Sequence, residues 1–274
     1  MNRTPSHRMP GRVRGAALAA VALALTVPAV AFPAVPQDAP ELGLEEVLAN
    51  HYEVMGGLED LGSVDSMRVS GSMTLGQGMQ GGFTNIIVRP NKMRLELEIQ
   101  GMTGVQAYDG ETAWMFMPFM GQSEPEAMPD EMAASVIRQA DIDGPLVNWQ
   151  DKGHRVDLVG MADVEGTETY ELEVVFESGH VQRHYLDAEY FVPVKVVSEE
   201  SMGGSEFESV QMPSDYKEVE GILVPHSIRV QGPQGTQTLT VESVEIGVEV
   251  DESIFEMPET EEADEGEQEG GSFR

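Results

Sequence analysis

The segment from Gly82 to Pro118 constrains the fold more than any other part of the chain. Within it, apolar and polar residues alternate in short runs that are separated by turn residues. Met93 and Leu95 fall on one side of the implied strand, whereas Arg94 and Glu96 fall on the other. A period of two is typical of an antiparallel sheet with one solvated and one apolar face. The segment therefore predicts a β-sheet whose apolar face must be covered.

The same alternation recurs along most of the chain and makes the fold class mainly β, with a few helices (α+β). It begins at Ser66 and returns in segments that glycine, proline or acidic residues separate. A sheet of about 11–12 antiparallel strands usually curls or closes on itself. We expect strands near residues 66–75, 83–89, 92–100, 103–109, 111–117, 154–161, 168–176, 180–187, 191–199, 206–218, 221–231 and 236–246.

Two segments have helical spacing instead. The first runs from Leu42 to Leu61, where the Gly56-Gly57 pair ends or bends the helix. The second lies between Pro125 and Ile142. It carries an apolar stripe that either forms a movable lid over the sheet or simply caps it, and we take its lid residues as Met128, Met132, Val136 and Ile137.

The N-terminus has the pattern of a secretory signal peptide. Arginines precede an apolar run, and Ala29-Val30-Ala31 matches an A-x-A cleavage site, so we expect residues 1–31 to be removed on export to the periplasm. The alternative is that this segment is not cleaved and remains as an N-terminal membrane anchor. The chain has no cysteine, which excludes a lipid-modified N-terminal cysteine, disulfides and thiolate metal sites. Residues 32–257 then form one domain, and the acidic segment 258–274 is expected to be a disordered tail.

The net charge of −32 limits the partners. Such a chain repels the phosphates of nucleic acids and anionic lipid head groups, so we expect no nucleic-acid partner. Acid-rich surfaces also suit high salt, and we interpret the charge as reflecting habitat or solubility rather than a partner.

Four short motifs together resemble the LolA family of periplasmic lipoprotein carriers. They are RPNKMR at 89–94, DGETAW at 109–114, the DY and GILVPH pair within 215–226, and FEMP at 255–258. The resemblance implies a half-open β-barrel that helices cover, and an apolar concavity that binds acyl chains. The same fold serves lipoprotein chaperones, lipid-binding lipoproteins and sensors of envelope stress.

The apolar face of the sheet is the main candidate site. Its residues either line a ligand cavity or form an ordinary core, and the abundance of methionine favours a surface that adapts to varied apolar ligands. We take the ligand-binding residues as Met67, Val69, Met73, Ile87, Met93, Leu95, Leu97, Trp114 and Phe116.

Catalysis and metal binding have little support in the sequence. His180 and His184 lie on one side of a predicted strand but too far apart to share a metal ion, and we interpret both as exposed polar residues. Arg68 and Arg94 are interpreted as members of surface ion pairs. No serine-hydrolase, zinc-protease or P-loop motif occurs. We therefore expect no enzyme activity, no metal and no cofactor.

These observations predict an exported, monomeric carrier. It would bind the acyl chains of a lipoprotein or lipid and exchange them with membrane-bound donor and acceptor proteins. The first alternative is a sensor or interaction module of the same fold that binds a protein partner. An enzyme on a β scaffold and a structural envelope protein with a fully packed core are the other two.

Overall fold

The computed structural model describes residues 42–259 apart from residues 203 and 234. The predicted signal peptide lies outside these residues, as does the predicted acidic tail beyond its first two residues. The account below concerns the described residues.

Three α-helices precede or interrupt the strands: α1 (Leu44–Met55), α2 (Leu58–Ser63) and α3 (Asp130–Gln139). The Gly56-Gly57 pair separates α1 from α2, as predicted. Gly56 has a φ of 125°, and a Cβ atom on it would lie 2.7 Å from the carbonyl oxygen of Gly221. Any larger residue would therefore be strained by its backbone and would clash with a strand.

The strands form a single antiparallel sheet of 13 strands, which confirms the predicted fold class. The spatial order runs β6-β5-β4-β3-β2-β1-β13-β12-β11-β10-β9-β8-β7, so β6 and β7 are free edges and the barrel is not closed. The two-residue edge strand β6 has no pattern in the sequence and was not predicted. The strands are β1 (Ser66–Thr74), β2 (Gln80–Val88), β3 (Lys92–Ile99), β4 (Met102–Tyr108), β5 (Ala113–Phe116), β6 (Glu126–Ala127), β7 (Arg155–Val164), β8 (Thr167–Val175), β9 (Val181–Asp187), β10 (Pro193–Met202), β11 (Ser205–Val219), β12 (Ile222–Gly232) and β13 (Gly235–Ile246).

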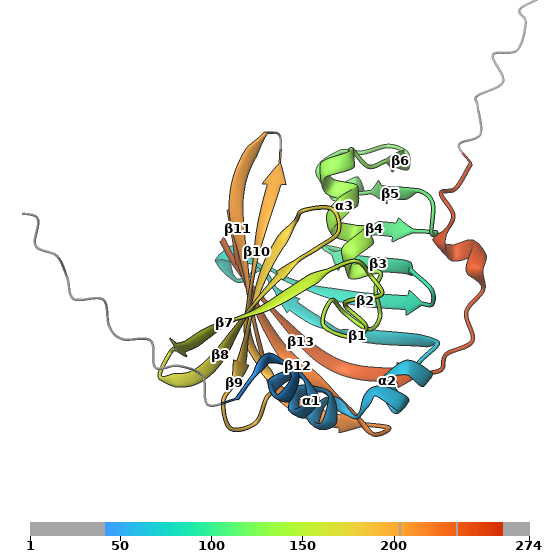
Figure 1. Cartoon of the computed structure of the whole chain (residues 1–274). Helices are drawn as coiled ribbons and strands as arrows, with labels where there is room; N and C mark the ends of the chain where they lie inside the picture. Colours follow the sequence, from blue (N-terminus) through green and yellow to red (C-terminus); the bar gives the residue numbers. More distant parts are fainter. Residues whose placement is uncertain (1–41, 203, 234, 260–274) are drawn as a thin grey trace, which may run out of the picture. The chain divides into compact units, whose positions relative to one another are not determined.

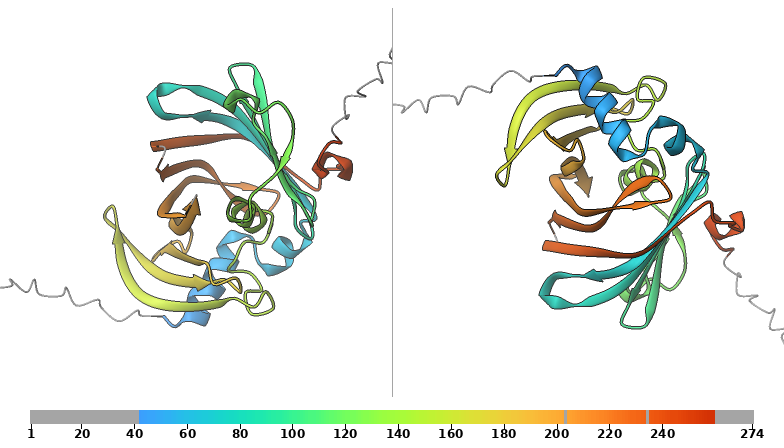
Figure 2. Two further views of the ribbon diagram at one scale, coloured as in Figure 1. Left: turned by 90° about the horizontal axis from the view of Figure 1, so that it is seen from above. Right: turned by 90° about the horizontal axis from the view of Figure 1, so that it is seen from below.

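The sheet curls so that its two halves face each other. In Figure 1, β1–β6 form one wall and β7–β11 form the other, with α3 between them. Figure 2 shows α3 inside the curl and α1 across one end of it. Three short 3₁₀ turns complete the fold: η1 (Gly76–Gly78), η2 (Pro118–Met120) and η3 (Glu252–Phe255), the last of which lies outside the curl (Figure 2).

Each of the two long helices packs on its own part of the inner face. Val47 and Leu48 of α1 join a buried cluster with Leu172 and Leu186 of β8 and β9. Val136 of α3 joins a second cluster, which also contains Ile87, Met93, Tyr108, Ala113, Met128 and Ala140. The apolar inner face is thus divided between two separate helices.

Candidate functional site

The register of the strands places most of the predicted binding residues on the inner face. In the antiparallel pairs, Met67 lies opposite Ile87, and Ile87 lies opposite Met93. Residues that lie opposite each other share a face. Val69, Leu95 and Leu97 pack beside the buried cluster of Met73, Phe83 and Val241 on this face. The predicted apolar face therefore exists, and seven of its nine proposed residues lie on it: Met67, Val69, Met73, Ile87, Met93, Leu95 and Leu97.

Trp114 and Phe116 lie on the opposite face, which corrects their assignment to the concavity. Trp114 is the cross-strand partner of Ala107, in the row of Arg94, whose guanidinium carbon lies 5.8 Å from the centre of the indole ring. Its indole N–H donates to the carbonyl oxygen of Phe255 at 2.7 Å. Trp114 therefore fixes the chain after β13 to the outside of the sheet. Ala113 and Met115 point into the concavity in place of Trp114 and Phe116.

Helix α3 lies directly on the inner face, as the lid prediction requires. Val136 is buried, and Met132 packs beside it on the cluster that contains Met93. The prediction for Ile137 is corrected, because its side chain is 41% exposed. The helix begins after Pro129, with two acidic residues in its first turn that favour the positive end of the helix dipole.

An arginine of the RPNKMR motif holds the loop that follows α3. Arg89 donates from both terminal nitrogens to the carboxylate of Asp143, at 2.7 and 2.6 Å. It also donates to the carbonyl oxygens of Val64 and Leu61, at 2.7 and 3.0 Å. The guanidinium holds the pKa of Asp143 below its usual value. The C-terminal end of α3 is thus tied to the end of α2.

A cavity of about 370 Å³ remains between α3 and the facing wall of the sheet. One side of it is apolar and consists of Met128, Met132 and Val136 from the α3 region. Phe207 and Val230 add apolar surface from β11 and β12. The polar residues that line it are Gln106, Glu131, Ser135, Gln139, Glu200, Ser201, Ser209 and Gln211. The cavity can hold a ligand that has both an apolar and a polar part.

An ion pair joins α3 to the wall across this cavity. The Nη2 atom of Arg138 donates to both carboxylate oxygens of Glu200 on β10, at 2.9 and 2.7 Å. Both side chains are largely buried, with exposed fractions of 14% and 17%. Ser198 donates to the same carboxylate at 2.8 Å, and His180 contacts the Ser198 hydroxyl at 2.9 Å. Sequence reasoning missed this pair, which we call the lid ion pair.

Helix α1 covers one end of the concavity and borders a cavity of about 330 Å³ with the loop that contains Trp149. Tyr52 donates to the carbonyl oxygen of Leu146 at 2.6 Å, and His51 Nδ1 lies 2.9 Å from the carbonyl oxygen of Phe191. His184 lies beneath this helix and contacts the Gln182 amide oxygen at 3.1 Å. Burial, and then the nearby His51, lower the pKa of His184 to about 4. The interpretation of His180 and His184 as exposed was wrong, because their side chains are largely buried. Arg68 and Arg94 do form ion pairs, with Glu245 and Glu96.

A larger cavity of about 450 Å³ lies on the other face of β11 and β12. Its residues Met212 and Arg229 alternate along these strands with Gln211 and Val230 of the first cavity. Its lining combines four apolar residues with four hydroxyl side chains and with the charged Glu165 and Arg229, which makes it less suited to an acyl chain.

No helix in the described part of the chain has the length and apolar character needed to cross a membrane. Residues 42–259, without 203 and 234, contain no group of three His, Asp or Glu side chains arranged to hold a metal ion.

Comparison with known proteins rests on structure alone, because no family model and no curated protein matches the chain. A LolA superfamily protein from Nitrosomonas europaea matches with a TM-score of 0.54 and 14% identity, over 78% of this chain and 98% of that chain. This chain has a LolA-like fold. A DUF1329 family protein from Desulfovibrio piger matches with a TM-score of 0.52 and 12% identity, over 75% and 95% of the two chains.

A third match is an outer membrane lipoprotein-sorting protein domain from Vibrio parahaemolyticus, with a TM-score of 0.49 and 13% identity, over 77% of this chain and 94% of that chain. The two matches with TM-scores above 0.5 show the LolA-like architecture, and their low identities leave the ligand to be argued from the site.

Proposed function

We propose that this protein is a carrier that binds the acyl chain of a lipid or lipoprotein in the cavity beneath α3. It acts by binding and release, without catalysis or a cofactor. One observation carries the proposal: the apolar stripe of Met128, Met132 and Val136 faces a cavity that the protein's own side chains leave open. A structural protein with a fully packed core has no such space.

The chemistry of the apolar side fits an acyl chain. Methionine is flexible and polarizable, so it adapts to ligands of different shape. Each buried CH₂ group contributes about 0.8 kcal/mol, so a chain of ten such groups would gain about 8 kcal/mol before the costs of binding. This amount is sufficient for reversible capture by apolar contact alone.

The size of the cavity limits which ligands fit while α3 lies on the sheet. Ligand pockets are commonly about 300–1,000 Å³. At about 370 Å³, the cavity is at the small end of this range and suits one chain. Several acyl chains would require α3 to move away from the sheet. The anchor between Arg89 and Asp143 holds its C-terminal end, so movement would begin at the N-terminal end.

The proposal places the protein in the periplasm. The signal-peptide pattern of residues 1–31 supports export, and the missing cysteine argues against a lipid anchor on the mature chain. Membrane-bound donor and acceptor proteins would deliver and collect the ligand.

The test is native mass spectrometry with organic extraction of the full-length gene product, purified from an envelope fraction. We expect a protein peak with an additional lipid or acylated peptide that extraction releases. A ligand-free mass, together with no uptake of a fluorescent fatty alcohol, would contradict the carrier function and favour an interaction module or a structural protein.

A matched pair of variants locates the ligand. Ser209→Phe fills the cavity beneath α3, whereas Ser214→Phe adds the same bulk to the cavity on the other face. We expect Ser209→Phe to lose the bound lipid and Ser214→Phe to retain it. Equal retention by both variants would place the ligand elsewhere.

A further inference from the structure

We propose that the ligand is an amphiphile with a cationic head group that donates hydrogen bonds, such as an ammonium, and that Glu200 binds this head. This inference rests on the proposed function, because it names the ligand class of the same cavity. It also implies that the ligand head and Arg138 compete for one carboxylate.

The charges of the cavity support a cationic head. Its lining contains two acidic residues, Glu131 and Glu200, and no lysine or arginine among the described residues. The neighbouring Arg138 is already neutralised by Glu200. Burial, and then the charge of Arg138, lower the pKa of the nearby His180, which disfavours the charged imidazole. The described lining therefore offers no lysine or arginine to an anionic head.

The lid ion pair shows that the Glu200 carboxylate on the facing wall can bind a cationic group that donates hydrogen bonds. A guanidinium occupies Glu200 through two charge-assisted hydrogen bonds, and the Ser198 hydroxyl supports the carboxylate from behind. An ammonium group can donate up to three hydrogen bonds to the same acceptors. Because Glu200 also lines the cavity, a bound ligand reaches it from inside while Arg138 reaches it from α3. A cationic head that displaces Arg138 would loosen α3.

The test compares three amphiphiles with the same chain: dodecylammonium, dodecyl maltoside and dodecanoate. Binding is measured by titration calorimetry on the full chain at submicellar concentrations. The buffer contains about 1 M salt, where the Debye length is about 3 Å and the net charge of the protein is screened. We expect dodecylammonium to bind at least about tenfold more tightly than dodecanoate, as a charge-assisted hydrogen bond implies.

Two substitutions at the lid ion pair have opposite expected effects. Glu200→Gln should reduce the ratio of ammonium to maltoside affinity by about tenfold, because the amide carries no charge. Arg138→Gln should raise that ratio, because it frees Glu200. A general loosening of α3 would change all three affinities together and leave the ratio unchanged.

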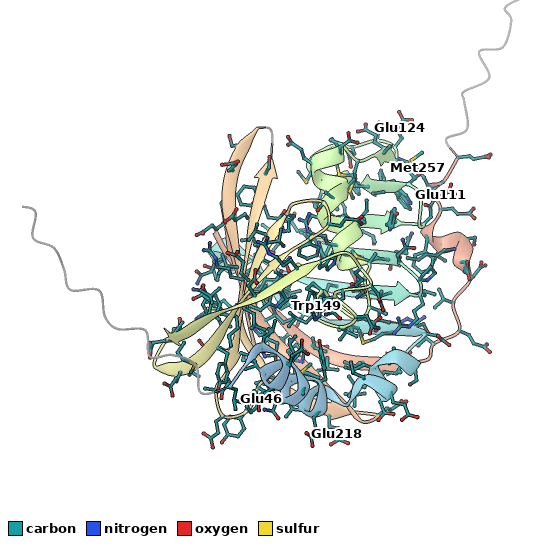
Figure 3. The ribbon with its side chains drawn as sticks, viewed as in Figure 1. Glu46, Glu111, Glu124, Trp149, Glu218 and Met257 are labelled. Atoms are coloured by element: carbon teal, nitrogen blue, oxygen red, sulfur yellow. The ribbon has the colours of Figure 1, made fainter. Side chains whose placement is uncertain are left out.

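Glu218→Gln is the matched control. Glu218 is exposed on β11 and points outward at the end of the sheet away from α3 (Figure 3). The substitution removes the same charge as Glu200→Gln. The ratio of ammonium to maltoside affinity of this variant should equal that of the wild type. If Glu200→Gln and Glu218→Gln behave alike, Glu200 is not the head-group site, although the carrier function stands. If the wild-type protein binds none of the three amphiphiles, both proposals fail.

Discussion

The two long helices cover the same curled sheet in different ways. Helix α1 buries Val47 and Leu48 almost completely and is tied down by hydrogen bonds from Tyr52 and His51. Helix α3 also buries Val136 on the inner face, but it reaches the opposite wall through an ion pair and borders a cavity with many polar residues in its lining. Apolar packing over a helix face resists opening, whereas an ion pair can exchange partners. We therefore expect α1 to stay in place and α3 to be the helix that moves.

The largest expected difference between the two helices is in stability. Leu48→Ala removes a side chain that is 2% exposed, and it should lower the free energy of unfolding by about 2–5 kcal/mol. Met132→Ala removes a partly exposed side chain at the cavity and should cost about 1 kcal/mol. Alanine favours helix, so helix propensity does not oppose either change. Urea denaturation measures the free energy of unfolding of both variants. Equal losses of stability would contradict the difference between α1 and α3.

The buried histidine under α1 makes that end sensitive to acid. The folded-state pKa of His184 is about 4, below the ordinary value near 6.5. Between these values the unfolded chain binds a proton that the folded chain does not, so stability falls as the pH falls. The contribution lost between pH 6.5 and pH 4 is about 3 kcal/mol.

The contribution of His184 is measured as a difference, because many carboxylates titrate over the same interval. Wild type and His184→Gln are unfolded in urea at pH 7, 5.5 and 4. The wild type should lose more stability than the variant as the pH falls. Parallel losses would show that His184 is not the acid-sensitive group.

Removing the lid ion pair should act on α3 alone. Arg138→Gln leaves Glu200 largely buried and without its charged partner, at a cost of about 1–3 kcal/mol. We expect faster amide exchange in residues 130–139 and unchanged exchange in residues 44–55. A uniform increase along the chain would mean that the pair supports the whole fold.

The sequence predicts the fold better than the site, for reasons that particular residues make clear. In β3, apolar and charged residues alternate, so Met93 and Leu95 can be assigned to the inner face. In β5 every residue is apolar, and alternation cannot say which of Trp114 and Met115 points inward. The cross-strand register decides this, and it depends on partners in β4.

The lid ion pair could not be predicted for a different reason. Arg138 and Glu200 are 62 residues apart, and Glu200 is one of 48 acidic residues in the chain. No spacing or motif selects it. The cavity likewise combines residues of α3 with residues of β10, β11 and β12, which only the curl of the sheet brings together.

Trp149 is a third residue whose role could not be predicted. It lies in the loop after α3 (Figure 3) and packs against the cluster under α1, and no sequence pattern indicates this contact.

Hydrogen–deuterium exchange of the wild-type protein, with and without dodecylammonium, tests the central claim most directly. We predict that residues 130–139 exchange through local opening, faster than residues 44–55, which exchange only through global unfolding. Bound dodecylammonium should change the exchange of α3 and leave that of α1 unaltered. Equal exchange of the two helices, with no response to the ligand, would contradict the account of α3 as a lid over a binding cavity.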